Sequence, residues 1–257
     1  VAVGLYNGAY PFARLLNTGN VMFSSIFLSN ASKMVSAGDT EQLASLFRTV
    51  VKWVAIVTLP VFVILIAFPR SVLLFFGEKY YSMAPVLRIL AAGFFISSLT
   101  GPVSRIYEAF ERTKLSMIFS GVLAFSNLLL NYILISTFPS RAPLAAAVAT
   151  STAFFVNFVL DVVFMKKMLG RQPFRSSVIR VVGAALTAIL VVYLLSNLLF
   201  AATPVWFLVI DLLIFSAVYA TIVGFGGVLE EDDRVVVEAV LRKLGLSEEH
   251  ASLLRYA

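Results

Sequence analysis

Seven long apolar stretches occupy most of this chain, and short polar connections separate them. Each stretch runs for about 19–28 residues, which at 1.5 Å per residue is enough to cross the ~30 Å hydrocarbon layer of a bilayer. We therefore predict an all-α, polytopic membrane helical bundle over residues 1–227. The expected spans lie near residues 3–29, 50–68, 84–107, 115–138, 143–165, 178–200 and 205–225.

The composition agrees with this architecture. Hydrophobic residues make up 60% of the chain and charged residues 13%, about half the charged share of a typical soluble domain. There is no cysteine and a single histidine, His250. Disulfides and thiolate chemistry are therefore excluded, and a catalytic metal held by histidines is not expected. The sequence also lacks a P-loop, so we expect no ATP hydrolysis, no cofactor and no enzyme activity.

Lysine and arginine gather in every second connection between the apolar stretches. The positive-inside rule places those connections in the cytoplasm. Val1 is then expected on the outer side of the cell membrane and the C-terminus in the cytoplasm. This bias also accounts for the net charge of +6, so we expect no nucleic-acid partner. The cytoplasmic group is Lys33, Arg48, Lys52, Arg105, Arg112, Lys114, Lys166, Lys167, Arg171, Arg175, Arg180, Arg234, Arg242, Lys243 and Arg255, against Arg70, Lys79 and Arg141 outside.

Three further segments have a distinct pattern. In the first connection, Asp39 or Thr40 can cap a short helix, which the apolar spacing of Leu43, Leu46 and Phe47 predicts to lie on the membrane surface. Residues 228–257 predict a cytoplasmic amphipathic helix with acids at its start and bases near its end. The sequence starts abruptly at Val1, which is not an initiator methionine, so we expect it to be a fragment with an N-terminal part missing.

Arg14 is the most informative polar residue inside an apolar stretch. It lies near the middle of the first span and shares a helical face with Asn7 and Asn17. A cation flanked by amides suits an anionic headgroup or a phosphate. The alternative is that Arg14 pairs with an acid on another helix for structural reasons.

Other buried polar residues extend the list of candidates. Asn127 and Asn131 lie one helical turn apart in the fourth span and would line the same cavity, or hold helices together. Arg88, near the outer end of the third span, could also line that cavity or reach the outer lipid phosphates. Asp161 and Asp211 are candidates for ion coupling, with structural pairing as the alternative. We expect no metal site.

Several short segments, in order, resemble polysaccharide flippases of the multidrug/oligosaccharidyl-lipid/polysaccharide superfamily. They begin with Val3-Gly4-Leu5-Tyr6 and Ala9-Tyr10, which resemble the start of that family's eighth helix. One departure is Leu28-Ser29-Asn30, where the family often has a proline. The remaining matches are Gly77-Glu78-Lys79-Tyr80, Ala84-Pro85-Val86-Leu87, Arg112-Thr113-Lys114, the two asparagines Asn127 and Asn131, and the alanine-rich run from Ala145 to Ser151.

The resemblance implies that the chain is the C-terminal lobe of a fourteen-helix transporter. Such a protein would flip a polyprenyl-pyrophosphate-linked oligosaccharide across the membrane by alternating access. The implied partners are this lipid-linked oligosaccharide, membrane lipids, the missing N-terminal lobe and glycan-assembly enzymes. A cation-coupled drug exporter, a peptidoglycan-precursor flippase and, less well supported, a membrane glycosyltransferase stay open as alternatives.

Overall fold

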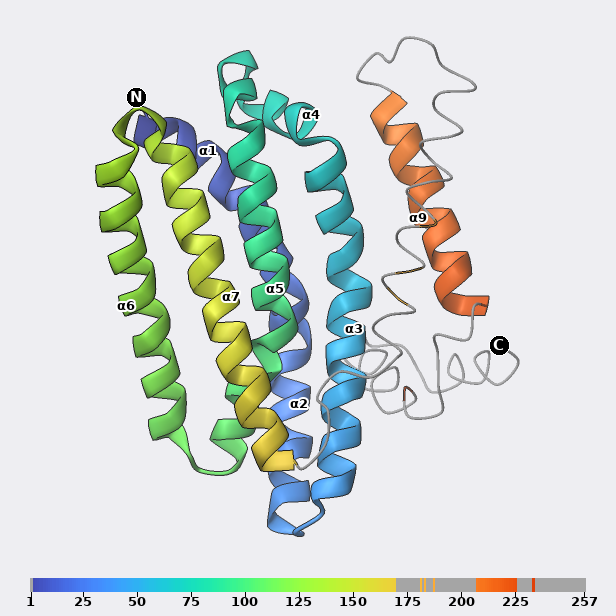
Figure 1. Ribbon diagram of the computed structural model, residues 1–257. Helices are drawn as coiled ribbons and strands as arrows, with labels where there is room; N and C mark the ends of the chain where they lie inside the picture. Colours follow the sequence, from blue (N-terminus) through green and yellow to red (C-terminus); the bar gives the residue numbers. More distant parts are fainter. Residues whose placement is uncertain are drawn as a thin grey trace.

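The computed structural model describes residues 2–169, 181, 183, 187, 207–225 and 233. All regular secondary structure in this part of the chain is helical, which confirms the all-α class (Figure 1). The elements are α1 (Ala2–Arg14), η1 (Leu15–Asn17), α2 (Thr18–Ser36), α3 (Thr40–Ala67), α4 (Pro69–Leu73), η2 (Leu74–Phe76), η3 (Glu78–Met83), α5 (Ala84–Ala109), α6 (Thr113–Thr137), η4 (Pro139–Arg141), α7 (Ala142–Leu169) and α9 (Phe207–Phe225).

Four helical segments of the described part are long and apolar enough to cross a membrane. They are α3, α6, the run Glu78–Ala109 that ends in α5, and the run Pro139–Leu169 that contains α7. These segments match the second to fifth predicted spans. Helix α9 coincides with the seventh predicted span. Its apolar segment, Leu213–Gly224, is shorter than the four segments above. The sixth predicted span and the tail lie outside the described residues, single positions excepted, so the count of seven stays a prediction.

The first predicted span is not one regular helix. Pro11 lies inside α1, where its ring nitrogen cannot donate to the carbonyl of Asn7. Three residues later α1 ends at Arg14, and the 3₁₀ turn η1 joins it to α2. Short 3₁₀ segments within a helix often mark a bend or hinge. The break therefore falls directly beside the cation that the sequence singled out.

The expected surface helix in the first connection is the beginning of α3. Asp39 caps this helix, and its Oδ1 accepts a hydrogen bond of 2.9 Å from the backbone N–H of Gln42. Leu43 and Phe47 are fully buried against α2 and α5, so the prediction of a helix lying on the membrane surface is wrong. The apolar spacing was read correctly, but the surface it meets is protein and not lipid.

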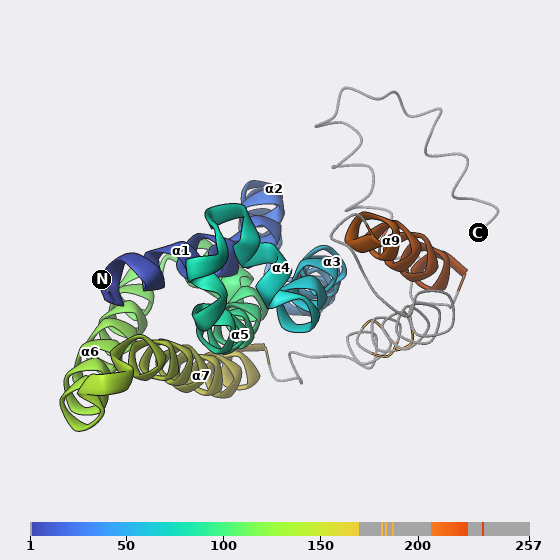
Figure 2. The same cartoon turned by 90° about the horizontal axis from the view of Figure 1, so that it is seen from above.

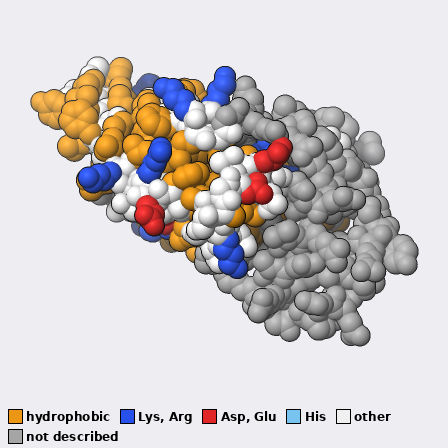
Figure 3. Space-filling model, turned by 90° about the horizontal axis from the view of Figure 1, so that it is seen from below, with side chains coloured by type: hydrophobic (Ala, Val, Ile, Leu, Met, Phe, Trp, Pro, Cys, Tyr) orange, Lys and Arg blue, Asp and Glu red, His pale blue; other side chains and the backbone are white. Residues whose placement is uncertain are grey.

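The connections predicted to share a side of the membrane lie at the same end of the bundle. In Figure 1 the N-terminus, α4 and the α6–α7 connection lie at the upper end, whereas the α2–α3 and α5–α6 connections lie at the lower end. Seen from below, Lys and Arg side chains of the described residues gather on that lower face, together with acidic ones (Figure 3). The alternation of charge therefore corresponds to a real separation in space.

Helix α5 lies at the centre of the described bundle. It packs against α1, α2, α3 and α7, while α6 touches mainly α7, and α9 touches α3 at the opposite side (Figure 2). The core has three parts. One cluster fills the lower half around Phe47 and Tyr107, a second fills the upper half around Leu87 and Phe94, and a third joins α3 to α9 through Leu59 and Phe215.

Lys52 is the main exception to the predicted distribution of charge. The sequence assigned it to a cytoplasmic connection, but it is 2% exposed within α3. Its Nζ lies 2.5 Å from Oδ2 of Asp233, and the indole Nε1 of Trp53 donates to Oδ1 of the same carboxylate at 2.9 Å. Asp233 is therefore fixed to α3 by an ion pair and a second hydrogen bond.

Candidate functional site

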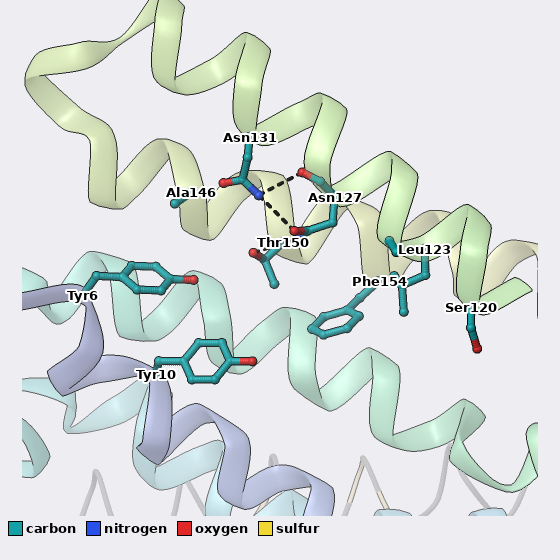
Figure 4. A pocket seen from close by; sticks show the side chains of 10 residues that line it. Tyr6, Tyr10, Ser120, Leu123, Asn127, Asn131, Ala146, Thr150 and Phe154 are labelled. Carbon is teal, nitrogen blue, oxygen red and sulfur yellow. Dashed lines mark hydrogen bonds between the residues drawn. The ribbon is translucent and has the colours of Figure 1, made fainter. Parts of the chain in front are cut away.

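A cavity of about 500 Å³ opens between α1, α6 and α7. Figure 4 shows its lining, with Tyr6 and Tyr10 extending from α1 toward the two asparagines of α6. No charged side chain is among the residues that line it. These are Tyr6, Tyr10, Ser120, Leu123, Ala124, Asn127, Asn131, Ala146, Thr150 and Phe154.

Hydrogen bonds hold the polar wall of this cavity in place. The amide Nδ2 of Asn127 donates to the Thr150 hydroxyl of α7 at 3.1 Å. Asn131 Nδ2 donates to the backbone carbonyl of Asn127 at 2.9 Å and to its Oδ1 at 3.1 Å. The two asparagines therefore act as one unit that also bridges α6 and α7. This confirms their helix-joining role and places them at a cavity.

Arg14 and Asn7 do not line this cavity. Both are exposed on the outer face of α1, while Asn17 in η1 is half-buried at the edge of that face. The neighbours Ala13 and Leu16 belong to the upper core cluster, and Phe23 belongs to the lower one. Arg14 is thus about midway between the two ends of the bundle.

No carboxylate of the described residues forms an ion pair with Arg14. The structural alternative, in which this cation is tied to an acid on a neighbouring helix, therefore has no support in residues 2–169. A guanidinium carries five N–H donors and cannot lose its charge, so at mid-depth of a membrane protein it needs water or an anion. Asn7 lies on the same exposed face and can contribute to such a site.

Arg88 lies apart from both groups. It is exposed near the upper end of α5, and its Nε donates to the backbone carbonyl of Ile66 at 3.0 Å. That carbonyl belongs to the last turn of α3, where helical carbonyls lack intrahelical partners. The contact gives Arg88 a role in joining α3 to α5. The six predicted cavity residues thus fall into a neutral pocket, an exposed cationic face and this separate contact.

Comparisons with known proteins support the assignment of the fold. A family model described as lipid II flippase MurJ matches residues 17–217. The chain belongs to the MurJ family. A solved structure of the lipid II flippase MurJ, in an inward closed conformation, superposes with a TM-score of 0.71 at 21% identity, over 86% of this chain and 46% of that one. An uncharacterized membrane protein of Methanocaldococcus jannaschii is 23% identical over 194 residues, 75% of this chain and 38% of that protein.

Membership of the MurJ family confirms the sequence resemblance at the level of lipid-linked flippases in the same superfamily. The family that matches is MurJ, which the sequence analysis held as an alternative to the polysaccharide flippases. It also agrees with a multi-pass protein of the cell membrane. The chain spans less than half the length of the relatives that it matches.

The structure adds a polar contact between α2 and α5 that the sequence did not reveal. Arg105 Nε donates to the Ser24 hydroxyl at 2.6 Å, and its Nη1 forms an ion pair of 2.7 Å with Glu108. The charge pattern of the sequence had placed Arg105 in a cytoplasmic connection. Only the packing of α2 against α5 brings Arg105 and Ser24 together.

Of the two acids proposed for ion coupling, Asp161 is described fully. It is 5% exposed in α7, and its partners are Asn157 of the same helix and Tyr107 and Thr100 of α5. Asp161 forms no ion pair with Lys166, which lies five residues later on α7 and is exposed. Asp211 lies in α9, and its side chain lies outside the described part.

Tyr6, Tyr10 and Thr150 are among the pocket residues that sequence reasoning missed. A signal existed, since Tyr6 and Tyr10 are one helical turn apart and share a face. Their phenol groups were noted only as part of a resemblance. Thr150 lies in an alanine-rich run, where nothing in the sequence indicates that its hydroxyl faces Asn127.

Proposed function

We propose that this chain is the C-terminal part of a flippase for a polyprenyl-pyrophosphate carrier bearing a sugar headgroup. The full-length protein would move this cargo from the cytoplasmic to the outer leaflet, with Val1 outside and the tail in the cytoplasm. The observation that carries the proposal is Arg14, an exposed cation at the 3₁₀ turn between α1 and α2 that forms no ion pair with any described carboxylate. Membership of the MurJ family supplies the class of cargo.

The chemistry of the exposed face suits a pyrophosphate. A guanidinium binds phosphate oxygens in a bidentate manner, and the neighbouring Asn7 amide can donate further hydrogen bonds. Pro11 removes the N–H that would bond the Asn7 carbonyl, and the 3₁₀ turn η1 follows Arg14 directly. An N-terminal lobe, for which the greater length of the relatives leaves room, would face this surface and enclose the cavity.

The neutral pocket would lie to one side of this site. Its phenol, amide and hydroxyl groups from Tyr10, Asn127 and Thr150 can bond uncharged polar groups without the cost of burying a charge. In this proposal the anionic part of the cargo meets Arg14 and the pocket borders the path. The prenyl chain stays in the lipid.

A transport assay on the full-length protein tests the role of Arg14. Arg14→Ala should lower the apparent affinity for the cargo by roughly 10- to 100-fold, because a hydrogen bond to a charged group contributes about 1.5–3 kcal/mol. Arg14→Lys should retain part of the activity, since the charge stays and the bidentate geometry is lost. Arg141→Ala, at an exposed position in η4, is the matched control and should leave transport unchanged. Unchanged transport by Arg14→Ala at normal protein levels would remove this residue from the mechanism.

The same assay separates two cargo classes. Vesicles containing the protein are supplied with a peptidoglycan lipid precursor or with a peptide-free oligosaccharide on the same carrier. The match to the lipid II flippase family favours the first cargo. Preferential transport of the second would restore the polysaccharide-flippase interpretation.

A further inference from the structure

Asp161 is a buried carboxyl group that lies away from both the pocket and Arg14. It is in the lower half of α7, one helical turn after Asn157, and Tyr107 reaches it from α5. Its Oδ2 accepts a hydrogen bond of 2.8 Å from Asn157 Nδ2, and the Tyr107 hydroxyl lies 3.5 Å from Oδ1. Tyr107 is 1% exposed, so this contact is closed to solvent within the described bundle.

None of the described basic groups compensates the charge of this carboxyl. On α7, Lys166 and Lys167 are exposed, and Lys114 at the start of α6 is exposed as well. The cations on neighbouring helices serve other partners or lie out of reach: Arg105 of α5 pairs with Glu108, Lys52 of α3 pairs with Asp233, and Arg48 of α3 forms no ion pair with Asp161. Tyr107 is the titratable group that faces Asp161 directly.

The amide of Asn157, beside Asp161, is not fully hydrogen-bonded. Asn157 Oδ1 is buried and has no hydrogen-bond partner, although Nδ2 of the same amide donates to Asp161. Buried acceptors in native proteins almost always have a donor. Here the amide oxygen lacks a donor, although it lies beside a carboxyl whose own oxygens accept from Asn157, Tyr107 and Thr100.

We propose that Asp161 is a proton-binding site. Its ionised and protonated states differ in the hydrogen bond that they form with Asn157. In the ionised state the amide NH₂ and the tyrosine hydroxyl both donate to the carboxylate. When a proton binds, the carboxyl O–H becomes a donor, the amide turns over, and Asn157 Oδ1 accepts from it. No bond other than this O–H bond forms or breaks, and the proton comes from water.

A proton fits this site better than a metal ion. One carboxylate oxygen already accepts an N–H donor, and Asp161 belongs to no cluster of three or more His, Cys, Asp or Glu side chains among the described residues. The site lies across the α5–α7 contact, so gain or loss of the proton changes the bonding between two central helices. Resting on the proposed function, we infer that transport takes up or releases this proton.

Infrared difference spectroscopy of the full-length protein in lipid nanodiscs tests proton binding without any cargo. Changing the pH should produce a carbonyl band from a protonated buried carboxyl, and the band should be lost in Asp161→Asn. The matched control is Glu111→Gln, which changes an exposed carboxyl in the α5–α6 connection and should retain the band. Tyr107→Phe should keep the band at a shifted frequency, since one hydrogen bond to the carboxyl is lost, and it serves if Asp161→Asn fails to fold.

Two results would overturn the site. One is a wild-type protein without a titrating band that depends on Asp161. The other is displacement of the band by sodium and not by choline at constant pH, which would make the site a metal-ion site.

Coupling is tested separately in vesicles that carry a pH gradient. The gradient should change the rate of cargo movement in the wild type and in Glu111→Gln, and this response should be lost in Asp161→Asn. Transport that ignores the gradient in the wild type would contradict coupling. Failure of all transport would contradict the proposed function, whereas the infrared band would still report on the proton site.

Discussion

Two buried aspartates in this protein are compensated in opposite ways. Asp233 is 3% exposed and has a lysine as its partner, whereas Asp161 is 5% exposed and has only neutral partners. The Asp233 contact joins residues 181 positions apart in the sequence. The Asp161 contacts join two adjacent helices. The same side chain therefore serves as one half of a fixed ion pair in one region and as a group free to change its charge in the other.

The comparison indicates which of the two regions tolerates the loss of a charge. Removing either member of the Lys52–Asp233 pair leaves the other buried and uncompensated. Removing the charge of Asp161 leaves no charge behind, because its neighbours are an amide and a phenol. The first region should be intolerant of neutral substitutions and the second tolerant. The following predictions are arranged to break or sharpen that contrast.

Lys52→Met should have the largest effect on stability. Methionine fills a similar volume, but the Asp233 carboxylate then lacks its cation, while the neutral Trp53 indole still donates to it. Breaking a buried ion pair in this way costs about 3–5 kcal/mol. Equilibrium unfolding of the purified protein in mixed micelles measures the loss.

The double variant Lys52→Met with Asp233→Leu is its control. Replacing both partners removes the uncompensated charge, so most of the lost stability should return. If Lys52→Met alone were as stable as the wild type, Asp233 would not depend on this lysine and the contrast with Asp161 would disappear.

Gly93→Ala tests the seam between α5 and α7 on which Asp161 depends. A Cβ at position 93 would collide with the backbone and side chain of Ser151, whose hydroxyl donates to the Ile89 carbonyl at 2.7 Å. Helix α7 must move, and overpacking of this kind costs about 1–3 kcal/mol. Gly121→Ala on α6 meets no atom within 4 Å and should stabilise by about 0.5–1 kcal/mol. Equal effects of the two changes would contradict the close approach.

The sequence predicted the elements of this fold well because hydrophobic length sets them locally. The second to fifth spans agree with the described helices within a few residues, except that α3 begins earlier, at Thr40. The break at Arg14 was not foreseen. Pro11 was visible, but a single proline predicts a kink more often than a change of helix type. The burial of Leu43 and Phe47 also depends on which surface comes to face them.

The sequence identified several individual polar residues of interest, but it did not show which of them lie together in space. Polar residues within apolar spans are few. Arg14, Asn127 and Asp161 could each be found because placing a polar side chain inside the membrane costs free energy. Which of them lie together depends on how the helices pack, and helical periodicity is silent on that point. The Lys52–Asp233 pair is the clearest case, because both residues had been assigned to solvent-accessible cytoplasmic segments.

Asp161→Asn should cost only about 0.5–1.5 kcal/mol. The amide keeps the volume of the carboxyl and can still accept from Tyr107, while no charge is left without a partner. The same unfolding assay measures it, beside Lys52→Met. A loss as large as that of Lys52→Met would show that the Asp161 charge is a fixed part of the fold, and the two regions would then follow one rule.

Asn127→Ala should have the smallest of these effects on stability. The change removes its bond to Thr150 and one of the two acceptors of Asn131, and a hydrogen bond between membrane helices contributes about 0.6 kcal/mol on average. Because the pocket lining is uncharged, its loss creates no buried ion, unlike the loss of Lys52. Unfolding measurements on Asn127→Ala and Thr150→Val, singly and combined, isolate the α6–α7 bond as a coupling energy. A coupling of several kcal/mol would mean that neutral contacts in this bundle can stabilise it as much as the ion pair does. The difference between the buried residues Asp161 and Asp233 would then no longer follow from charge.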